Sequence, residues 1–281
     1  MVENNLQKQE TEKPAGDTLP MIALRGKVIF PKTFVSFDVG RAISVRAAES
    51  AMETDGKVFL AAQKNALQDN PHKGDVYEYG VVARITQITK LPGGGQKLSA
   101  EALYRARSEN VTFTDGAFRV VAVREDYIGG DEAEIEAYFR LARQSVVEYT
   151  LFDKQMPKDV MTRLAEIENA DEFIDNVLSV IFFKEKSCQE ILQESVTTVR
   201  LKKFCKLMAR ELEIAKIERR VSASVRRSID KNQKEYYLRE QLKAIHAELG
   251  DDEDEKKVLS DEIKEKHLPK EVEEKALKEL A

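Results

Sequence analysis

The sequence predicts an α+β protein in which a small, curled antiparallel β sheet precedes a group of helices and one long helix. Three observations support this prediction. Apolar and polar residues alternate with a period of two in short runs up to about residue 125, and the period changes to 3.6 from about residue 130. From residue 196 to residue 249 there is no proline or glycine, which favours one uninterrupted helix.

Strands are predicted where runs of β-forming residues end at turn residues. The clearest runs are residues 21–24, 57–62, 80–91, 96–103, 105–113 and 118–125. Pro92 and the glycines after it predict one hairpin turn, and Asp115-Gly116 predicts another. One helix, over residues 41–55, interrupts the strands. Together these elements describe a sheet that is half or fully closed.

Helical spacing of apolar residues begins at residue 131 and predicts a compact helical subdomain. Three helix starts are indicated within it. Pro157 is typical of the first turn of a helix, and Asp171 is expected to cap the next one. Ser187 and Glu190 have the spacing of a capping box.

The long helix is predicted over residues 196–250. At 1.5 Å per residue it would be about 80 Å long, which favours a coiled coil or an arm between modules. Residues 216–243 contain nine Lys and Arg but only four Asp and Glu. The acidic run at 251–255 is predicted to be a solvated loop before two shorter helices. The last helix stops in mid-pattern at residue 281, so we expect a piece of a larger protein.

Five parts are therefore predicted along the chain. They are a disordered tail (1–18), a β subdomain (19–127), a helical subdomain (128–195), the arm helix (196–250), and an acidic loop with further helices (251–281). Of the 281 residues, 42% are hydrophobic and 34% are charged, and the net charge is −5. There is no apolar run of the length that a membrane span needs, and the first 18 residues carry no targeting signal. Two cysteines exclude a disulfide framework, so we expect a cytoplasmic protein.

No set of residues in the sequence supports a reaction. The glycines at 93–95 lack the spacing of a phosphate-binding loop, and the three histidines lie far apart. Cys188 and Cys205 are expected to be buried small hydrophobic residues rather than reactive thiols. We expect no catalytic, cofactor or metal site in this chain.

Eight ordered motifs carry a resemblance to a known family. They lie at residues 24–31 (LRGKVIFP), 37–41, 59–64, 75–83, 90–94, 233–245 (QKEYYLREQLKAI), 268–272 and 275–280. Together they resemble the N-terminal region of bacterial Lon-family (LonA type) ATP-dependent proteases, and the motif at 233–245 is the most specific. The resemblance covers nearly the whole chain from Leu19. Ala102 and the loop at 65–74 depart from the family's usual pattern.

The resemblance implies a PUA-like antiparallel β-barrel subdomain, a helical subdomain and an arm helix that leads to an AAA+ ATPase module. It also implies that the parent protein is an ATP-dependent serine endopeptidase that uses ATP and Mg²⁺. Such a protease works as a homohexamer and degrades misfolded, damaged and short-lived regulatory proteins. The family's ATPase and Ser–Lys dyad would lie beyond residue 281, so this chain alone is expected to be inactive.

Substrate recognition is the function that we expect of this region, because an unfoldase must first bind exposed apolar segments. The candidate contacts are the loop residues Phe34, Val35, Leu91 and Pro92, with Tyr236 and Tyr237 on the arm helix. Each pair has a structural alternative. Phe34 and Val35 would plug the end of the barrel, Leu91 and Pro92 would be isolated surface residues, and the tyrosines would pack between neighbouring arms.

Two other functions stay open. The arm helix carries a basic stripe that would bind DNA weakly, although four acids dilute it and no aromatic residue precedes Tyr236. The stripe consists of Arg219, Arg220, Arg226, Arg227, Lys231 and Lys234. The second possibility is a purely structural role as an oligomerisation arm.

Overall fold

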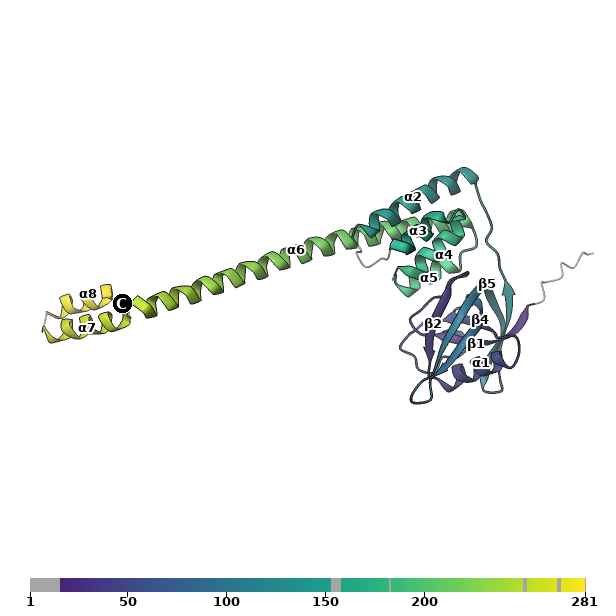
Figure 1. Cartoon of the computed structure of the whole chain (residues 1–281), viewed down its shortest axis with the longest axis horizontal. Coiled ribbons are helices and arrows are strands. Elements are labelled where there is room, and N and C mark those ends of the chain that lie inside the picture. Colours follow the sequence, from purple (N-terminus) through teal and green to yellow (C-terminus); the bar gives the residue numbers. More distant parts are fainter. Residues whose placement is uncertain (1–15, 153–157, 182, 250–251, 267–268, 281) are drawn as a thin grey trace, which may run out of the picture. The chain divides into compact units, whose positions relative to one another are not determined.

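The computed structural model describes residues 16–152, 158–181, 183–249, 252–266 and 269–280. The chain divides into two compact units, Met1–Ala215 and Lys216–Ala281. Figure 1 shows a barrel-like sheet followed by helices, which confirms the predicted α+β class with a long helix. Within the described residues no helix is long and apolar enough to cross a membrane.

The sheet is a closed barrel with one additional strand. Its strands are β1 (Asp17–Leu24), β2 (Phe34–Val39), β3 (Lys57–Ala62), β4 (Tyr79–Lys90), β5 (Gln96–Thr114) and β6 (Ala117–Arg124). The strand order is β2-β5-β4-β3-β1-β6, and β6 also pairs with β5, which closes the barrel. All pairings are antiparallel except that of β1 with β3, whose connection contains helix α1 (Ala42–Met52). A parallel pair requires such a crossover.

The long strand β5 replaces the two strands that the sequence predicted on either side of Tyr104. Its residues 96–101 pair with β2, and its residues 106–114 pair with β6. Two register shifts in its pairing with β4 let the strand bend without a turn. One strand therefore serves two different neighbours.

Both faces of the barrel wall are buried. In β3, Val58 and Leu60 belong to one apolar cluster, while Phe59 and Ala61 belong to another. Helix α1 adds small residues to the first cluster, at Ala47, Ala48 and Ala51. Successive side chains of β3 thus point alternately into two apolar clusters. This explains why the sequence of β3 is a continuous apolar run.

The helical part of the first unit packs around a third cluster. It contains α2 (Glu132–Thr150), α3 (Lys158–Glu166), α4 (Ala170–Val180), α5 (Glu185–Leu192) and the first turns of α6 (Thr197–Leu249). Phe30 from the β1–β2 connection enters this cluster, whereas its neighbour Ile29 enters the barrel core. Two adjacent side chains therefore anchor one segment in both cores.

Both cysteines lie in the helical cluster, as predicted. Burial, followed by the nearby Glu185 carboxylate, raises the pKa of the Cys188 thiol to about 12. Burial alone raises the pKa of Cys205 to about 11. Neither thiol is in the reactive thiolate form near neutral pH.

The predicted helix starts at Asp171 and Ser187 were wrong. Helix α4 is capped by Asn169, whose side chain accepts a hydrogen bond from the backbone N–H of Glu172 at 2.9 Å. Asp171 lies inside α4 and is buried against Arg200. Ser187 lies inside α5, which begins at Glu185. The predicted start at Pro157 lies outside the described residues.

The second unit contains the rest of α6 and helices α7 (Asp252–Glu265) and α8 (Lys270–Leu280). The prediction of an acidic loop at 251–255 was wrong from Asp252 onward, because these residues form the first turn of α7. At the other end of the chain, Asp17 and Thr18 belong to β1 rather than to a tail. The remaining tail prediction, for residues 1–15, lies outside the described residues.

A buried charged network holds the helices together around Arg200. The Arg200 side chain is fully buried and donates hydrogen bonds to Asp171 at 2.5 Å and to Asp175 at 2.6 Å. It also donates to the carbonyl of Ile191 at 3.2 Å. Arg200 thus links α4, α5 and α6 through one guanidinium group.

Tyr127 extends this network to the barrel. Its ring centroid lies 3.8 Å from the guanidinium carbon of Arg200 and 4.8 Å from that of Arg105 on β5. Arg105 donates to the carbonyl of Leu192 at 3.0 Å and to the Ser195 hydroxyl at 2.7 Å. The Tyr127 hydroxyl donates to Asp175 at 2.9 Å, and burial, followed by the Asp175 charge, raises the pKa of Tyr127. These contacts join the barrel to the helices.

We expect Arg200→Leu to lower the free energy of unfolding by about 3–5 kcal/mol, because two buried carboxylates lose their cation. Urea titration followed by circular dichroism measures this change. The control is Arg140→Leu, which removes an exposed pair with Glu136 and should cost no more than about 1 kcal/mol. Equal effects of the two substitutions would contradict the role given to Arg200.

Candidate functional site

Phe34 begins strand β2 and is 80% exposed. The prediction that Phe34 and Val35 lie in a loop was wrong, because they pair with Glu101 and Ala100 of β5. Val35 points the other way and packs against the barrel core, as its structural alternative required. Phe34 does not plug the barrel. A large apolar side chain is therefore held in solvent by a hydrogen-bonded strand.

A groove of about 310 Å³ lies beside Phe34, between the start of β2 and the helices α3 and α4. Its lining residues are Lys32, Thr33, Phe34, Val160, Arg163, Leu164, Ile167, Asn176, Ser179 and Val180. We call these residues the Phe34 groove. Lys32 pairs with Glu172 of α4 at 2.5 Å, which ties the strand to the helix. Apolar and polar side chains therefore line the groove together.

Leu91 and Pro92 lie in the β4–β5 turn, where the sequence predicted them. The backbone N–H of Leu91 donates to the carbonyl of Gly95 at 2.8 Å, and Gly93 and Gly94 have φ of 93° and 88°. Such positive φ values favour glycine. Leu91 is half-buried and Pro92 is exposed.

The two predicted contact pairs in the barrel lie at opposite ends of β2. Phe34 pairs with Glu101, whereas Val39 pairs with Gln96 at the end of the turn that holds Pro92. At about 3.4 Å per residue this separation is about 17 Å along the strand. The structure therefore keeps Phe34 apart from Leu91 and Pro92.

Tyr236 and Tyr237 lie on α6 in the second unit and are 68% and 62% exposed. The Tyr237 hydroxyl accepts a hydrogen bond from Gln241 at 3.0 Å. Their contact with a substrate or with a neighbouring arm stays a prediction.

The helical side of the Phe34 groove was missed by sequence reasoning. Val160 and Leu164 of α3 are buried in the helical cluster. Their second role depends on how α3 meets the start of β2, 120 residues earlier in the chain. No local sequence pattern marks this role, because it depends on contacts between elements that lie far apart in the chain.

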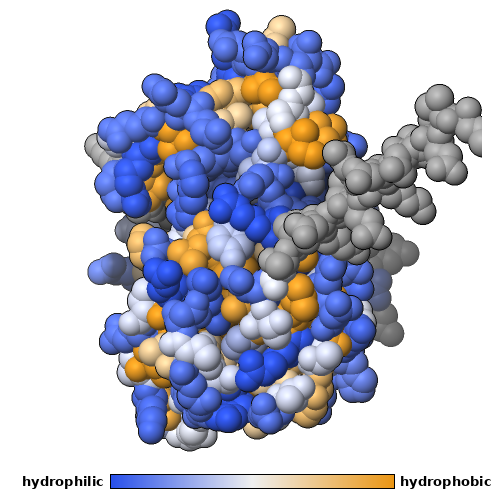
Figure 2. All heavy atoms as spheres, turned by 90° about the vertical axis from the view of Figure 1, so that its right-hand side faces the viewer, coloured by the Kyte–Doolittle hydropathy of each residue, from blue (hydrophilic) through white to orange (hydrophobic). Residues whose placement is uncertain are grey.

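The side chains that line the Phe34 groove are apolar, hydroxyl, amide and basic. In the part of the chain that the structure describes, no three His, Cys, Asp or Glu side chains are placed to hold a metal ion. Figure 2 shows hydrophobic residues in small groups separated by hydrophilic ones on one face.

A small β-barrel joined to a helical subdomain is thus the class of protein that the fold defines. The family model described as ATP-dependent protease La (LON) substrate-binding domain matches residues 18–210, and the chain belongs to this family.

Relatives with similar sequences agree with this assignment. The chain is 37% identical over 271 residues to a Lon protease of Clostridioides difficile, covering 93% of this chain and 34% of the relative. It is 40% identical over 267 residues to a Lon protease of Heliobacterium modesticaldum, covering 93% of this chain and 33% of the relative. The chain therefore spans about a third of the length of these relatives.

The fold is also similar to a solved structure, the N-terminal domain of Mycobacterium avium complex Lon protease. The TM-score is 0.58 at 15% sequence identity, with 69% of this chain and 98% of that chain covered. At this identity the likeness supports the fold.

We expect Phe34→Ala to change the free energy of unfolding by no more than about 0.5 kcal/mol, because its side chain is already in water. Phe37→Ala, three residues along the same strand, removes a ring packed on the barrel core and should cost about 1–3 kcal/mol. Thermal unfolding of both variants measures the difference. A large loss for Phe34→Ala would show that the ring supports the fold.

Proposed function

We propose that this chain is the substrate-recognition region of a protease and that it binds exposed apolar segments of unfolded proteins at the Phe34 groove. The observation that carries the proposal is an 80% exposed phenylalanine beside a groove lined by apolar and polar residues, in a chain of a substrate-binding family. Burying a phenylalanine ring contributes about 1.5–3 kcal/mol. A contact of this size is weak and reversible, which suits first capture of a substrate.

We extend the proposal to the protein that contains this chain. It would be a cytoplasmic ATP-dependent serine endopeptidase that uses ATP and Mg²⁺ and degrades misfolded, damaged and short-lived regulatory proteins. Support comes from the family description, which names an ATP-dependent protease, and from relatives named Lon protease. Within this proposal the present chain supplies recognition, and we expect it to show no ATPase or protease activity by itself.

The first test concerns the ring of Phe34. Phe34→Asp should weaken binding of a reduced, carboxymethylated protein about tenfold or more, because the apolar contact is replaced by a charge. Fluorescence anisotropy of the labelled unfolded protein gives the dissociation constants. Leu67→Asp is the matched control, since Leu67 is 90% exposed elsewhere on the barrel unit. Equal losses from the two variants, or none from Phe34→Asp, would count against the Phe34 groove.

The second unit supports a role in assembly. Ile217, Val221, Val225 and Ile229 recur every four residues on α6, and each is about half exposed. Such a stripe is typical of helices that pack against other helices. We propose that this stripe contributes to self-association and to the homohexamer of the full protein.

Sedimentation tests this second proposal. The unmodified chain should self-associate as its concentration rises, and Val221→Glu combined with Val225→Glu should shift it toward the monomer, because charges replace the apolar contact. Arg226→Glu is a control on the same helix that leaves the apolar stripe intact. A chain that stays monomeric at every concentration would overturn the proposal.

A further inference from the structure

Strand β6 closes the barrel along only part of its height, and beside it an opening remains between β1 and β2. Strand β6 pairs with both β5 and β1, but with β1 only at residues 17–21. Strand β2 occupies the corresponding place on the other half of β5, and its pairing is with β5 alone among the described residues. Ile22, Ala23 and Leu24 of β1 therefore have a partner on the β3 side only. We call this opening the β1–β2 seam.

The β1 side of the seam is closed by a side chain. The guanidinium group of Arg41 donates a hydrogen bond to the carbonyl of Ala23 and another to Gln63 at 2.7 Å. Leu24, the next residue, directs its carbonyl to β3, where it accepts from the backbone N–H of Gln63 at 2.8 Å. Arg41 thus takes the place of a missing strand partner at Ala23.

The β2 side of the seam is an open strand edge. The carbonyl of Thr33 accepts from the backbone N–H of Ala102 at 2.9 Å, so this residue faces β5. Backbone groups alternate along an antiparallel strand, which places those of Val35 and Phe37 toward β5 as well. The backbone groups of Ser36 and Asp38 are therefore directed away from β5. An edge of this kind is a template for pairing with another extended chain.

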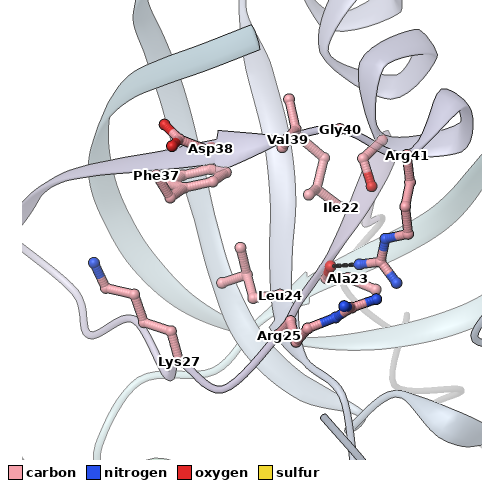
Figure 3. Close-up of a pocket in the computed structure, with 11 residues that line it drawn as sticks. Ile22, Ala23, Leu24, Arg25, Lys27, Phe37, Asp38, Val39, Gly40 and Arg41 are labelled. Atoms are coloured by element: carbon pink, nitrogen blue, oxygen red, sulfur yellow. Dashed lines mark hydrogen bonds between the residues drawn. The ribbon is translucent and has the colours of Figure 1, made fainter. Parts of the chain in front are cut away.

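A cavity of about 400 Å³ lies in the seam between the two strands. Figure 3 shows Leu24 of β1 and Phe37 of β2 pointing toward one another in its middle, with Lys27 on one side and Arg25 and Arg41 on the other. Asp38 is the acidic residue in the lining, so the lining carries two more positive than negative charges.

The positive charge is concentrated at two places in the cavity. Arg25 pairs with the exposed Asp69 at 2.8 Å, and Lys27 stands in solvent at the other side. Partial burial, followed by repulsion from Arg25, lowers the pKa of Arg41. An apolar floor between cations is complementary to a segment in which apolar and acidic residues alternate.

We propose that the β1–β2 seam binds an extended polypeptide segment, with alternating apolar and acidic residues, as an additional strand on β2. Its main-chain groups pair with the open edge at Ser36 and Asp38, its apolar side chains cover Leu24 and Phe37, and its carboxylates lie near Lys27. Strand addition of this kind draws affinity from main-chain hydrogen bonds and specificity from alternate side chains. The inference rests on the proposed binding of unfolded proteins, and it assigns a second surface and a mode of binding.

The test uses the whole chain and a short labelled peptide in which valine and glutamate alternate. Two further versions carry N-methyl groups on one or the other alternate set of peptide amides. The peptide version that is methylated on the N–H groups facing β2 should bind about tenfold or more weakly. The version that is methylated on the other N–H groups should lose less than about twofold in affinity. Binding through side chains alone would make the two sets equal, and that result, or no binding at all, would overturn the inference.

The charge of the seam is tested separately. Lys27→Glu should weaken binding of the glutamate peptide about fivefold or more and strengthen binding of a version with lysine in place of glutamate. Lys206→Glu is the control, an exposed lysine on α6 within the first unit. An equal response to both substitutions would refute the charge complementarity.

The outcomes separate the two proposals. If both N-methylated sets behave alike while Phe34→Asp still weakens binding of the carboxymethylated protein, only the seam is wrong. If one set binds selectively while Phe34→Asp has no effect, the Phe34 groove is wrong and the seam stands.

Discussion

The guanidinium group of Arg200 is the contact on which the helical part of the first unit depends. It neutralises Asp171 and Asp175 of α4, donates a hydrogen bond to the carbonyl of Ile191, and stacks on Tyr127. Removing a charge from water costs several kcal/mol, and the cost is offset here because every strong donor and acceptor has a partner. The geometry of the network is therefore demanding, and it selects one arrangement of α4, α5 and α6.

This arrangement also determines where the binding surfaces lie. Tyr127 and Arg105 connect the network to the barrel, and Ile29 and Phe30 anchor the β1–β2 connection in both cores. The start of β2 is thus fixed against α4, where Lys32 meets Glu172. The Phe34 groove forms where the barrel meets the helical part of the first unit.

Local pattern predicted the elements that carry their own signals. Strand β3 matched its predicted range of 57–62, and the long helix followed from the absence of proline and glycine. Strand β2 was not predicted, because Phe34 and Val35 owe their extended conformation to pairing with β5, more than 60 residues away. Asp171 resembles a capping residue in sequence, and only the distant Arg200 makes it a buried ion-pair partner.

The candidate site was predictable only in part, for the same reason. Phe34 was singled out because a large apolar residue stood near turn residues, whereas the helices that complete its groove have no local mark of that role. The seam has an equally distant origin. Its opening depends on β5 changing partners from β2 to β6 along a single strand, which no short window of sequence contains.

The two buried cysteines make it possible to measure how often the helical core opens. Cys188 and Cys205 sit in the core that Arg200 holds together, and their thiols stay protonated and covered while that core is closed. An alkylating reagent reaches them only when the helices separate. The rate of modification therefore measures how often the helices separate. Because barrel residues contain no cysteine, the signal comes from the helices alone, and the chain carries a natural reporter of its own unfolding.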